Sequence, residues 1–491
     1  LSDDIGLGDI PISLDIASEY IQNNNIFFYN DQYNFKINVS LNQSGFPKEF
    51  YFPALSSPIM IDVDQDSQKE ILFGDFDGKI RAFNLDGSLV QNNIFPFTTG
   101  SQIWASIAKA DIDLDGTVDY MVGSKDKFLY LFDAHGFKGA YNAESFLIGT
   151  PAIGNLDEDP ELEIVFGGFS SGNGRNIYAL NHDLSDVDGF PVYIGEKIKH
   201  GVALSDFNGN GIDDIVFGTD SDNIYLLYDS GSVADGFPYT MGDKISGAPS
   251  IIKNDETNLI VAGSEDGFLY GINSLGESEF IFQADSDIST SLAFLNFQNQ
   301  CYIIFGGDDG MLYVVDTHGS PVSPFPIDAG GKISKSVVLS DINLDNIPDI
   351  IYGTDTGQLN VLSIYGNQSI AHMPIMYPFS FESAPLVYDI DGDLDQEILI
   401  GTNQSLNVYD VKQYGDNIGY WSMFRGNERR NGVHVYAPYC LNGDLNGDTS
   451  FDITDIIVLI NIILYLIDPT PSELCSGDLN FDGQIDLFDA I

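Results

Sequence analysis

The sequence predicts an all-β protein, an eight-bladed β-propeller of four-stranded antiparallel blades, followed by a small α-helical calcium-binding module. Two observations predict the propeller. Apolar segments end in a glycine every 43 to 51 residues, and an alternating series of Asp, Asn and Glu begins twelve residues before six of these glycines. The glycines are Gly74, Gly123, Gly167, Gly218, Gly263, Gly306, Gly353 and Gly401. Beyond residue 434, two acidic loops of a different type predict the C-terminal module. Seven or nine blades are also compatible with the repeat.

The N-terminal part of the chain carries strand-like segments without a complete blade. Residues 1–25 show no clear pattern and form an unassigned extension. Residues 26–40 (IFFYNDQYNFKINVS) align with the second and third strands of a blade, and residues 44–52 align with a fourth strand. The last repeat has no fourth strand of its own after Tyr409. We therefore expect N-terminal strands to complete the last blade and close the ring, in a propeller domain spanning residues 26–434.

Each repeat is expected to form four short strands. In residues 201–242, the segments GVALSDF, DIVFGT and NIYLLYDS predict three strands, and GFPYTMG leads into a short fourth strand. Asp, Asn and Gly separate these segments, as in an antiparallel meander. The repeats around 251–263 and 294–306 keep the strands but lack the acidic loop. Packing alone must therefore hold those two blades.

Six repeats contain an acidic loop between their first and second strands. Side-chain oxygens occupy loop positions 1, 3, 5 and 9, and the main-chain carbonyl of position 7 lies between them. This spacing favours Ca²⁺, which accepts six to eight oxygen ligands in flexible geometry, over the stricter octahedron of Mg²⁺. One such loop could be an ordinary Asx turn, but six in the same register predict about six calcium ions. The predicted ligands, with position 7 included, are Asp62, Asp64, Asp66, Gln68 and Glu70; Asp111, Asp113, Asp115, Thr117 and Asp119; Asn155, Asp157, Asp159, Glu161 and Glu163; Asp206, Asn208, Asn210, Ile212 and Asp214; Asp341, Asn343, Asp345, Ile347 and Asp349; and Asp389, Asp391, Asp393, Asp395 and Glu397.

These repeats resemble FG-GAP/VCBS repeats, the calcium-loop repeats of integrin-α-like propellers. The resemblance rests on the D-x-D-x-D-x-x-x-D/E loop, on the terminal segment WSMFRGNERRNG, and on Phe-Gly pairs at 73–74, 166–167, 217–218 and 305–306. It implies a calcium-binding extracellular propeller. It does not fix the function, because the family includes adhesins, lectins and some enzymes.

The C-terminal residues 435–491 contain two copies of a loop-then-helix unit, GDLNGDTSFDITDIIVLINIILYL and GDLNFDGQIDLFDAI. Their predicted ligands are Asp444, Asn446, Asp448, Ser450, Asp452 and Asp455, and Asp478, Asn480, Asp482, Gln484, Asp486 and Asp489. The pair resembles a type I dockerin whose second helix is cut short at Ile491. This resemblance implies up to two further calcium ions and a cohesin-like or surface partner. Loop positions 10 and 11, which usually contact cohesin, are here the more apolar pairs Ile453-Thr454 and Leu487-Phe488.

Three cysteines are present. Cys440 and Cys475 stand four and three residues before the two C-terminal loops, so the pseudo-symmetry of the module predicts a disulfide between them. Cys301 falls within a predicted strand and is expected to be a core thiol.

Composition excludes several classes of partner. Twenty Lys and Arg against 73 Asp and Glu give a formal net charge of −53, which disfavours nucleic acids and anionic membrane surfaces. The 34 Phe and 25 Tyr argue against disorder. No charge-free stretch of 18 apolar residues predicts a membrane span. The chain starts at Leu1 without a signal peptide, which is expected of a processed product or a fragment.

The leading functional prediction is a secreted, non-catalytic binding or adhesion scaffold. Its blades would present loops to a glycan or an extracellular protein, and its tail would dock or anchor it. One alternative is self-assembly as a subunit of an extracellular filament or surface layer. Another is a calcium-dependent polysaccharide lyase, for which Lys199, His200 and Arg425 are the candidate neutralising groups. We find no catalytic motif, so an enzyme is not expected.

Overall fold

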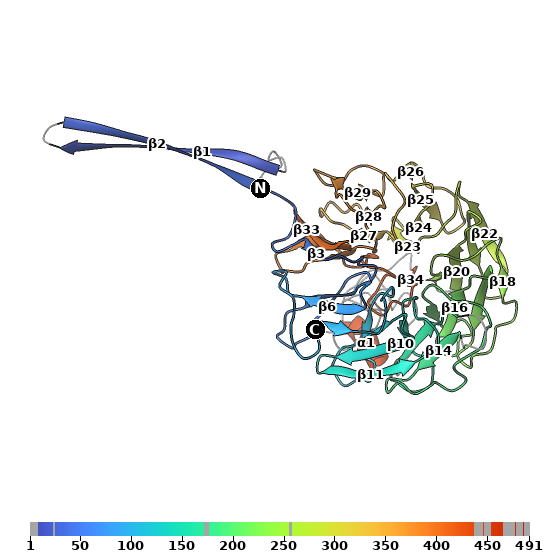
Figure 1. Ribbon diagram of the computed structural model, residues 1–491. Helices are drawn as coiled ribbons and strands as arrows, with labels where there is room; N and C mark the ends of the chain where they lie inside the picture. The colour runs from blue at the N-terminus through green and yellow to red at the C-terminus, as the bar shows by residue number, and fades with distance from the viewer. Residues whose placement is uncertain are drawn as a thin grey trace.

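The computed structural model describes residues 8–22, 25–170, 176–254, 258–436 and 453–464, together with residues 445, 477 and 485. Eight sheets follow one another along the chain and are arranged as a ring (Figure 1). We number these blades 1 to 8 in chain order. The ring confirms the predicted eight-bladed propeller. A separate two-stranded hairpin extends from the ring, and one short helix lies near the C-terminus.

In blades 1 to 7 the strands follow one another in the chain from the inner strand at the ring axis to the outer strand, and in blade 8 the outer strand comes from the N-terminal part. Blades 1 to 4 contain β4 (Ile59–Ile61), β5 (Glu70–Gly74), β6 (Lys79–Phe83) and β7 (Phe97–Thr98); β8 (Ala108–Ala110), β9 (Asp119–Gly123), β10 (Phe128–Asp133) and β11 (Gly136–Asn142); β12 (Ala152–Gly154), β13 (Glu163–Gly167) and β14 (Ile177–Leu180); and β15 (Ala203–Ser205), β16 (Asp214–Gly218), β17 (Asn223–Leu227) and β18 (Tyr239–Thr240).

Blades 5 to 8 complete the ring. They contain β19 (Ser250–Lys253), β20 (Asn258–Gly263), β21 (Phe268–Ile272) and β22 (Ser278–Gln283); β23 (Ala293–Phe297), β24 (Gln300–Gly306), β25 (Met311–Asp316) and β26 (Ile327–Asp328); β27 (Val338–Ser340), β28 (Asp349–Gly353), β29 (Gln358–Ser363) and β30 (Ile375–Met376); and β31 (Leu386–Tyr388), β32 (Asp395–Gly401), β33 (Ser405–Tyr414) and β3 (Lys48–Glu49).

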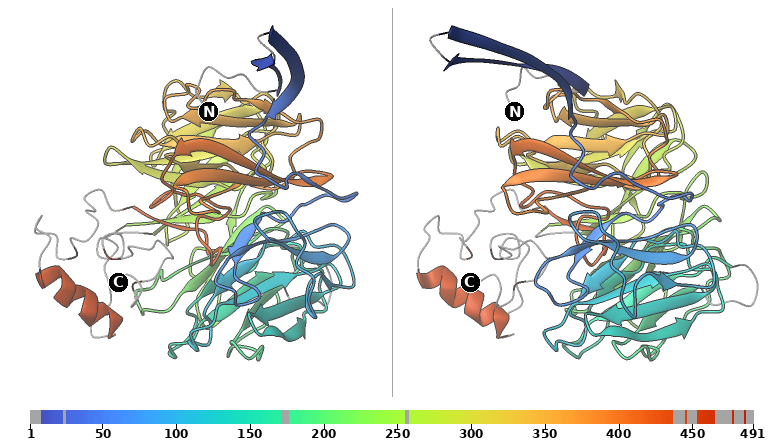
Figure 2. Two further views of the ribbon diagram at one scale, coloured as in Figure 1. Left: turned by 90° about the vertical axis from the view of Figure 1, so that its left-hand side faces the viewer. Right: turned by 60° about the vertical axis from the view of Figure 1, so that its left-hand side comes forward.

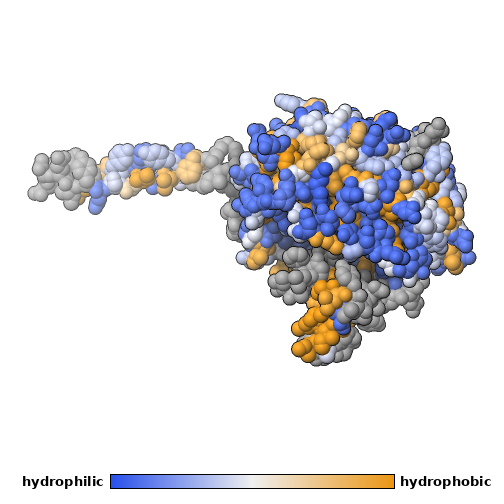
Figure 3. Space-filling model, turned by 90° about the horizontal axis from the view of Figure 1, so that it is seen from below, coloured by the Kyte–Doolittle hydropathy of each residue, from blue (hydrophilic) through white to orange (hydrophobic). Residues whose placement is uncertain are grey.

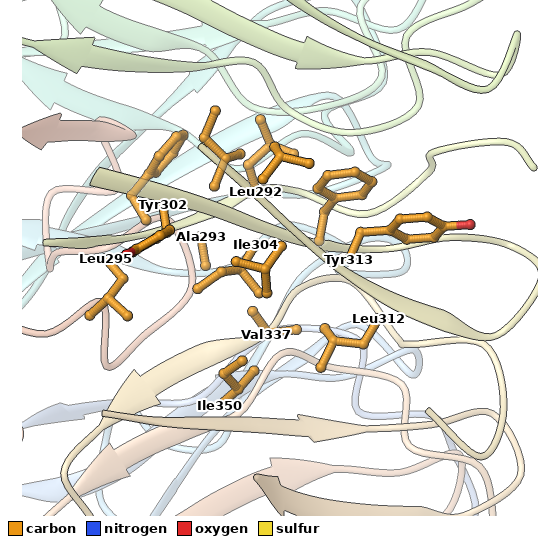
Figure 4. Packing of buried hydrophobic residues seen from close by; sticks show 14 of the residues in the cluster. Leu292, Ala293, Leu295, Tyr302, Ile304, Leu312, Tyr313, Val337 and Ile350 are labelled. Atoms are coloured by element: carbon orange, nitrogen blue, oxygen red, sulfur yellow. The ribbon is translucent and has the colours of Figure 1, made fainter. Parts of the chain in front are cut away.

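Apolar side chains from both faces of each sheet fill the space between neighbouring blades. Figure 4 shows this packing between blades 6 and 7, where Leu295 and Ile304 of one sheet lie near Val337 and Ile350 of the other. All four side chains are buried. Because both faces of a blade must be covered, the central strands are apolar throughout rather than alternating. This explains why the repeat contains continuous apolar runs such as DIVFG and EILFG.

The repeating Phe-Gly pair has two packing roles. In three of the four pairs the phenylalanine stacks on a tyrosine directly opposite on the third strand, as Phe217 does on Tyr225 with a centroid distance of 5.2 Å, whereas Phe73 lies opposite Arg81. The glycine lies against the next blade: a Cβ at Gly263 would fall 2.3 Å from Cγ2 of Ile288. Corresponding distances of 2.3–2.8 Å occur at the other six glycines before Gly401. Only glycine allows the blades this close approach.

The ring is closed by strands from both ends of the chain. Blade 8 takes its first three strands from residues 386–414 and its fourth strand, β3, from the N-terminal part. The closure uses residues 41–54, whose backbone forms hydrogen bonds with blade 8 from Leu41 to Ala54, and the prediction that residues 26–40 belong to the propeller is wrong. Those residues form β2 (Asn25–Val39), which pairs along its full length with β1 (Gly8–Gln22). The physical reason is competition, because β32 and β33 already fill the second and third positions of blade 8.

Residues 416–436, here called the axial segment, run along the inner strands of the blades. Their backbone carbonyls accept hydrogen bonds from the inner strands of blades 7, 8, 2, 3 and 4, and Gly432 accepts one from blade 5. Its last part, β34 (Val433–Val435), adds to β19 as a parallel fifth strand of blade 5. Two arginines of this segment are each 1% exposed. Arg425 donates to backbone carbonyls of blades 4 and 5, and Arg430 donates to backbone carbonyls of blades 1 and 2. The axial segment thus connects most of the ring from inside.

Candidate calcium loops and docking helix

The six acidic loops share one backbone design. In five of them, the position-1 aspartate accepts two or more main-chain N–H groups from within its own loop, as Asp62 does from Gln65 at 2.7 Å and Ser67 at 3.1 Å. The corresponding residues in the other loops are Asp111, Asp206, Asp341 and Asp389. Gln65 and Ser67 have φ of 64° and 71°, a left-handed conformation that this tight turn imposes. The first ligand therefore also shapes the loop.

Positions 5 and 7 are linked in every loop. The side-chain oxygen of position 5 accepts the N–H of position 7, at 2.8 Å from Gln68 to Asp66 and at 2.7–3.2 Å in the others. The other position-7 donors are Thr117, Glu161, Ile212, Ile347 and Asp395. This bond uses the N–H of position 7 and leaves its carbonyl for another partner, as the predicted ligand pattern requires.

The position-9 carboxylate is buried at the start of the second strand. One of its oxygens accepts the N–H of loop position 2, with distances of 2.5–3.2 Å in all six blades. The residues are Glu70, Asp119, Glu163, Asp214, Asp349 and Glu397, and none is more than 2% exposed. The same contact in six blades fixes this carboxylate beside the loop.

The second oxygen of this carboxylate provides a test of whether a cation fits. Oε1 of Glu163 and Oε1 of Glu397 are buried and have no hydrogen-bond partner. Burial raises the pKa of each of these two carboxyl groups to about 8. Burial likewise raises the pKa of Glu70, Asp214 and Asp349 to about 7. An unpaired buried carboxylate is costly, and a divalent cation would compensate it.

Carboxylates converge beside these oxygens. In four loops, at least three side chains each bring one carboxylate oxygen to within 4.8 Å of the others. The sets are Asp62, Asp64 and Asp66; Asp111, Asp113 and Asp115; Asp157, Asp159 and Glu163; and Asp391, Asp393, Asp395 and Glu397. The loops of blades 4 and 7 replace carboxylates by Asn208, Asn210 and Asn343. Hard oxygen donors at this spacing suit Ca²⁺, which would tie the first strand of each blade to the second.

Blade 2 differs in a way that sequence reasoning missed. The ammonium group of Lys138, on β11, lies 2.8 Å from Oδ2 of Asp113 and 2.7 Å from Oδ1 of Asp119. Two predicted calcium ligands of this loop are therefore paired with a lysine of the same blade. The available signal was Lys138 itself, a basic residue in the hairpin formed by the third and fourth strands of blade 2.

In the C-terminal module, helix α1 (Ile453–Ile463) is apolar on two sides. Leu459 and Ile462 are buried and pack with Leu445 and Ile485. On the opposite side a continuous stripe is 46–70% exposed, and it comprises Ile453, Ile456, Ile457, Ile460 and Leu464. This apolar surface is visible in Figure 3, and the red helix stands beside the propeller in Figure 2.

The structure places only part of the predicted tail site. Asp455 is described and is 3% exposed. The other predicted ligands of both tail loops lie outside the described residues, as do Cys440 and Cys475. Cys301 is a buried free thiol in β24, as expected.

A cavity of about 790 Å³ opens between blades 8, 1 and 2 and the axial segment. Its wall includes Lys69, Tyr388, Tyr420, Glu428 and Lys109. The Lys69 ammonium donates to the Tyr388 hydroxyl at 2.9 Å, and Lys109 forms an ion pair with Glu428 at 2.7 Å. The predicted loop residues Asp62 and Asp111 border it. Its size is typical of small-ligand sites.

The family model described as Dockerin type I domain matches residues 442–491. The match does not cover the propeller repeats, so their FG-GAP/VCBS type stays a prediction. Among solved structures, the computationally designed Ika8 protein has a TM-score of 0.52 at 15% identity, with 75% of this chain and 99% of that chain covered. BamB from Moraxella catarrhalis has a TM-score of 0.48 at 13% identity, with 75% and 99% covered. A comparison with curated proteins finds no significant match. No described helix is long and apolar enough to span a membrane.

Proposed function

We propose that this chain is a secreted, calcium-stabilised and non-catalytic scaffold that docks onto a cohesin-type protein through its C-terminal module. The observation that carries this proposal is the exposed apolar stripe of α1 within the segment that matches a type I dockerin domain. Dockerin domains bind calcium and cohesin partners. A helix whose second apolar side faces solvent gains stability when a partner covers that side.

The experiment measures binding of the intact chain to a panel of recombinant type I cohesins by biolayer interferometry, with calcium and with excess EDTA. The pair Ile456→Lys and Ile460→Lys should weaken binding at least tenfold. Asn461→Lys adds one lysine to the same helix beside the stripe and should change binding less than threefold, and the single variant Ile460→Lys is its charge-matched comparison. Absence of calcium-dependent binding to every cohesin, or equal effects of the stripe and control variants, would contradict the proposal.

For the propeller, we propose that the cavity beside blades 8, 1 and 2 receives a glycan or an extracellular protein. Two of its cationic groups have partners within the cavity, Lys109 with Glu428 and Lys69 with the hydroxyl of Tyr388. A glycan array and a surface-protein pull-down, each repeated with Glu428→Gln, test this assignment. Loss of the selected ligand in the variant supports it, and unchanged binding contradicts it.

The buried Arg425 argues for a non-catalytic role. Its guanidinium donates to Pro249 O at 2.6 Å and to Val202 O at 2.7 Å, so this candidate neutralising group of a lyase is engaged by the backbone. An ultraviolet assay for unsaturated products on acidic polysaccharides tests the point. Product formation by the purified chain would overturn the non-catalytic proposal.

A further inference from the structure

The β1–β2 hairpin leaves the ring as an isolated two-stranded ribbon (Figures 1 and 2). Its strands pair in register over fifteen residues each, from Gly8 opposite Val39 to Gln22 opposite Asn25. At about 3.3 Å per residue, the ribbon is roughly 50 Å long. A two-stranded hairpin is at best marginally stable in water, because neither face is covered.

The register divides the described side chains into two unlike faces. Residues opposite each other share a face, so Leu14 lies with Tyr33 and Ile16 lies with Asp31. One face, here called the apolar face, carries Leu14, Ile16, Tyr29, Tyr33 and Phe35, which are 43–56% exposed. The other face is mainly polar, and its exposed residues are Ser13, Asp15, Ala17, Glu19, Asn30, Gln32 and Asn34. Only Ile26 and Phe28, next to the turn, add large apolar groups there.

The single charge among the described residues of the apolar face is already paired. The carboxylate of Asp31 accepts hydrogen bonds from the hydroxyls of Tyr29 at 3.0 Å and Tyr33 at 2.9 Å. These two tyrosines flank Asp31 on β2. A flat surface that approaches this face therefore meets aliphatic and aromatic groups, the hydroxyl of Ser18 and one hydrogen-bonded carboxylate. Such a surface is typical of an interface rather than of a solvated ribbon.

We propose that the apolar face packs against the same face of a second copy of this chain, forming a two-layer dimer of four strands. A sheet that is apolar on one face is stable only when that face is buried, and a two-fold axis lets one surface cover itself. Edge-to-edge pairing would leave the face in water. A ribbon about 50 Å by 10 Å would bury on the order of 1,000 Å² over both copies, the lower limit for a specific interface.

The position of the ribbon also reduces the electrostatic cost of pairing. Each chain has a formal net charge of −53, which opposes contact between two propellers. Antiparallel packing of two ribbons keeps the rings at opposite ends of a roughly 50 Å spacer, well beyond the Debye length of about 8 Å at physiological salt. Repulsion between the rings is therefore already screened at physiological salt, and the dimer should change little as salt rises further, unlike an association held by ion pairs.

Sedimentation equilibrium of the full chain in calcium buffer tests the proposal. We expect a monomer–dimer equilibrium in the micromolar range, as suits an interface near the size limit. The double variant Leu14→Lys with Tyr33→Lys charges a cross-strand pair on the apolar face and should weaken dimerisation at least thirtyfold. The matched variant Ser13→Lys with Asn34→Lys charges the neighbouring pair on the polar face and should change it less than threefold.

Three results would overturn the proposal. The first is a wild-type chain that stays monomeric at concentrations of several hundred micromolar. The second is a dimer that persists in the Leu14→Lys, Tyr33→Lys variant, since edge pairing or contact through another surface would be insensitive to it. The third is an equal loss in the polar-face control. Unchanged thermal melting of the propeller in both variants excludes a general folding defect. Binding to cohesin depends on the tail and is measured separately.

Discussion

Calcium removal should destabilise the propeller, and the loss should grow as the pH rises. In the metal-free protein, burial raises the pKa of Glu163 and Glu397 to about 8, against a usual value of 4.5. The folded state then binds more protons than the unfolded state between these two values. Stability from the protonated groups is therefore complete below about pH 4.5 and is lost as the pH rises through 8.

The free energy of unfolding that is lost with rising pH follows from the size of the pKa shift. One pKa unit corresponds to about 1.4 kcal/mol, and the loops remain partly open to water, so we discount the full shift by about half. Glu163 then accounts for roughly 2 kcal/mol, and Glu397, which titrates together with Asp395, acts in the same direction. Saturating calcium binds the ionised carboxylates and should remove this pH dependence, because the ion stabilises only the folded state.

Guanidinium unfolding at pH 5.5 and pH 8, with calcium or with EDTA, measures the effect. The two tryptophans of the chain, Trp104 and Trp421, both lie in the propeller and report its unfolding by fluorescence. The double variant Glu163→Gln with Glu397→Gln should lose part of the slope with pH in EDTA, because Glu70, Asp214 and Asp349 keep their raised pKa values. The reasoning is refuted if the free energy of unfolding of the chelated protein is constant or rises from pH 5.5 to 8. Buried carboxyl groups with raised pKa values require this free energy to fall over that range.

Three further predictions concern single positions. Gly263→Ala should destabilise the propeller by about 1–3 kcal/mol in thermal or chemical unfolding, because the new Cβ would lie 2.3 Å from Ile288 Cγ2. Lys138→Met should raise calcium affinity at blade 2 by about ten- to a hundredfold in a calorimetric titration, since two charged hydrogen bonds of roughly 1.5–3 kcal/mol no longer compete. Arg425→Met should cost about 3–5 kcal/mol in the same unfolding assay, because Val202 O and Pro249 O lose their donor inside the ring.

The glycine and lysine variants each have a control in the same chain. Gly116→Ala changes a glycine with φ of 87° and nothing within 4 Å of the new Cβ, so it carries only the conformational cost. Lys127→Met removes a blade 2 lysine that contacts Phe146 rather than the acidic loop. Equal effects of Gly263→Ala and Gly116→Ala would contradict the close-approach argument. Equal calcium affinity in Lys138→Met and Lys127→Met would contradict competition by Lys138.

The sequence was sufficient to predict the blades because each blade repeats the same local requirements. Gly218 must allow the approach of Ile245, Phe217 must stack on Tyr225, and Asp206 must cap its own loop. These contacts join residues that are close in the sequence or separated by a fixed number of residues. The residue types that make them therefore recur at a regular interval along the chain. The loop ligands were predicted for the same reason, and their carboxylates converge in the structure.

The remaining features depend on partners distant in sequence. Residues 26–39 satisfy the pattern of blade strands, but β32 and β33 occupy the same place, and no local signal decides between two equivalent candidates. The axial segment is irregular, and its bonds reach residues more than 170 positions away, as from Arg425 to Ser250. Lys138 reaches Asp113 across 25 residues without a repeating counterpart. Such contacts appear only once the ring has assembled.

The parallel pairing of β34 with β19 has a mechanical consequence. The residues that match a dockerin domain, 442–491, come after this strand in the chain, so in the proposed docked state tension on the tail acts along β34. Tension in that direction loads the hydrogen bonds to β19 together, in shear, instead of opening them one after another. The force then passes into the buried arginines and is shared among the blades that they join. A chain tethered in flowing liquid would be held by its strongest part, the centre of the ring.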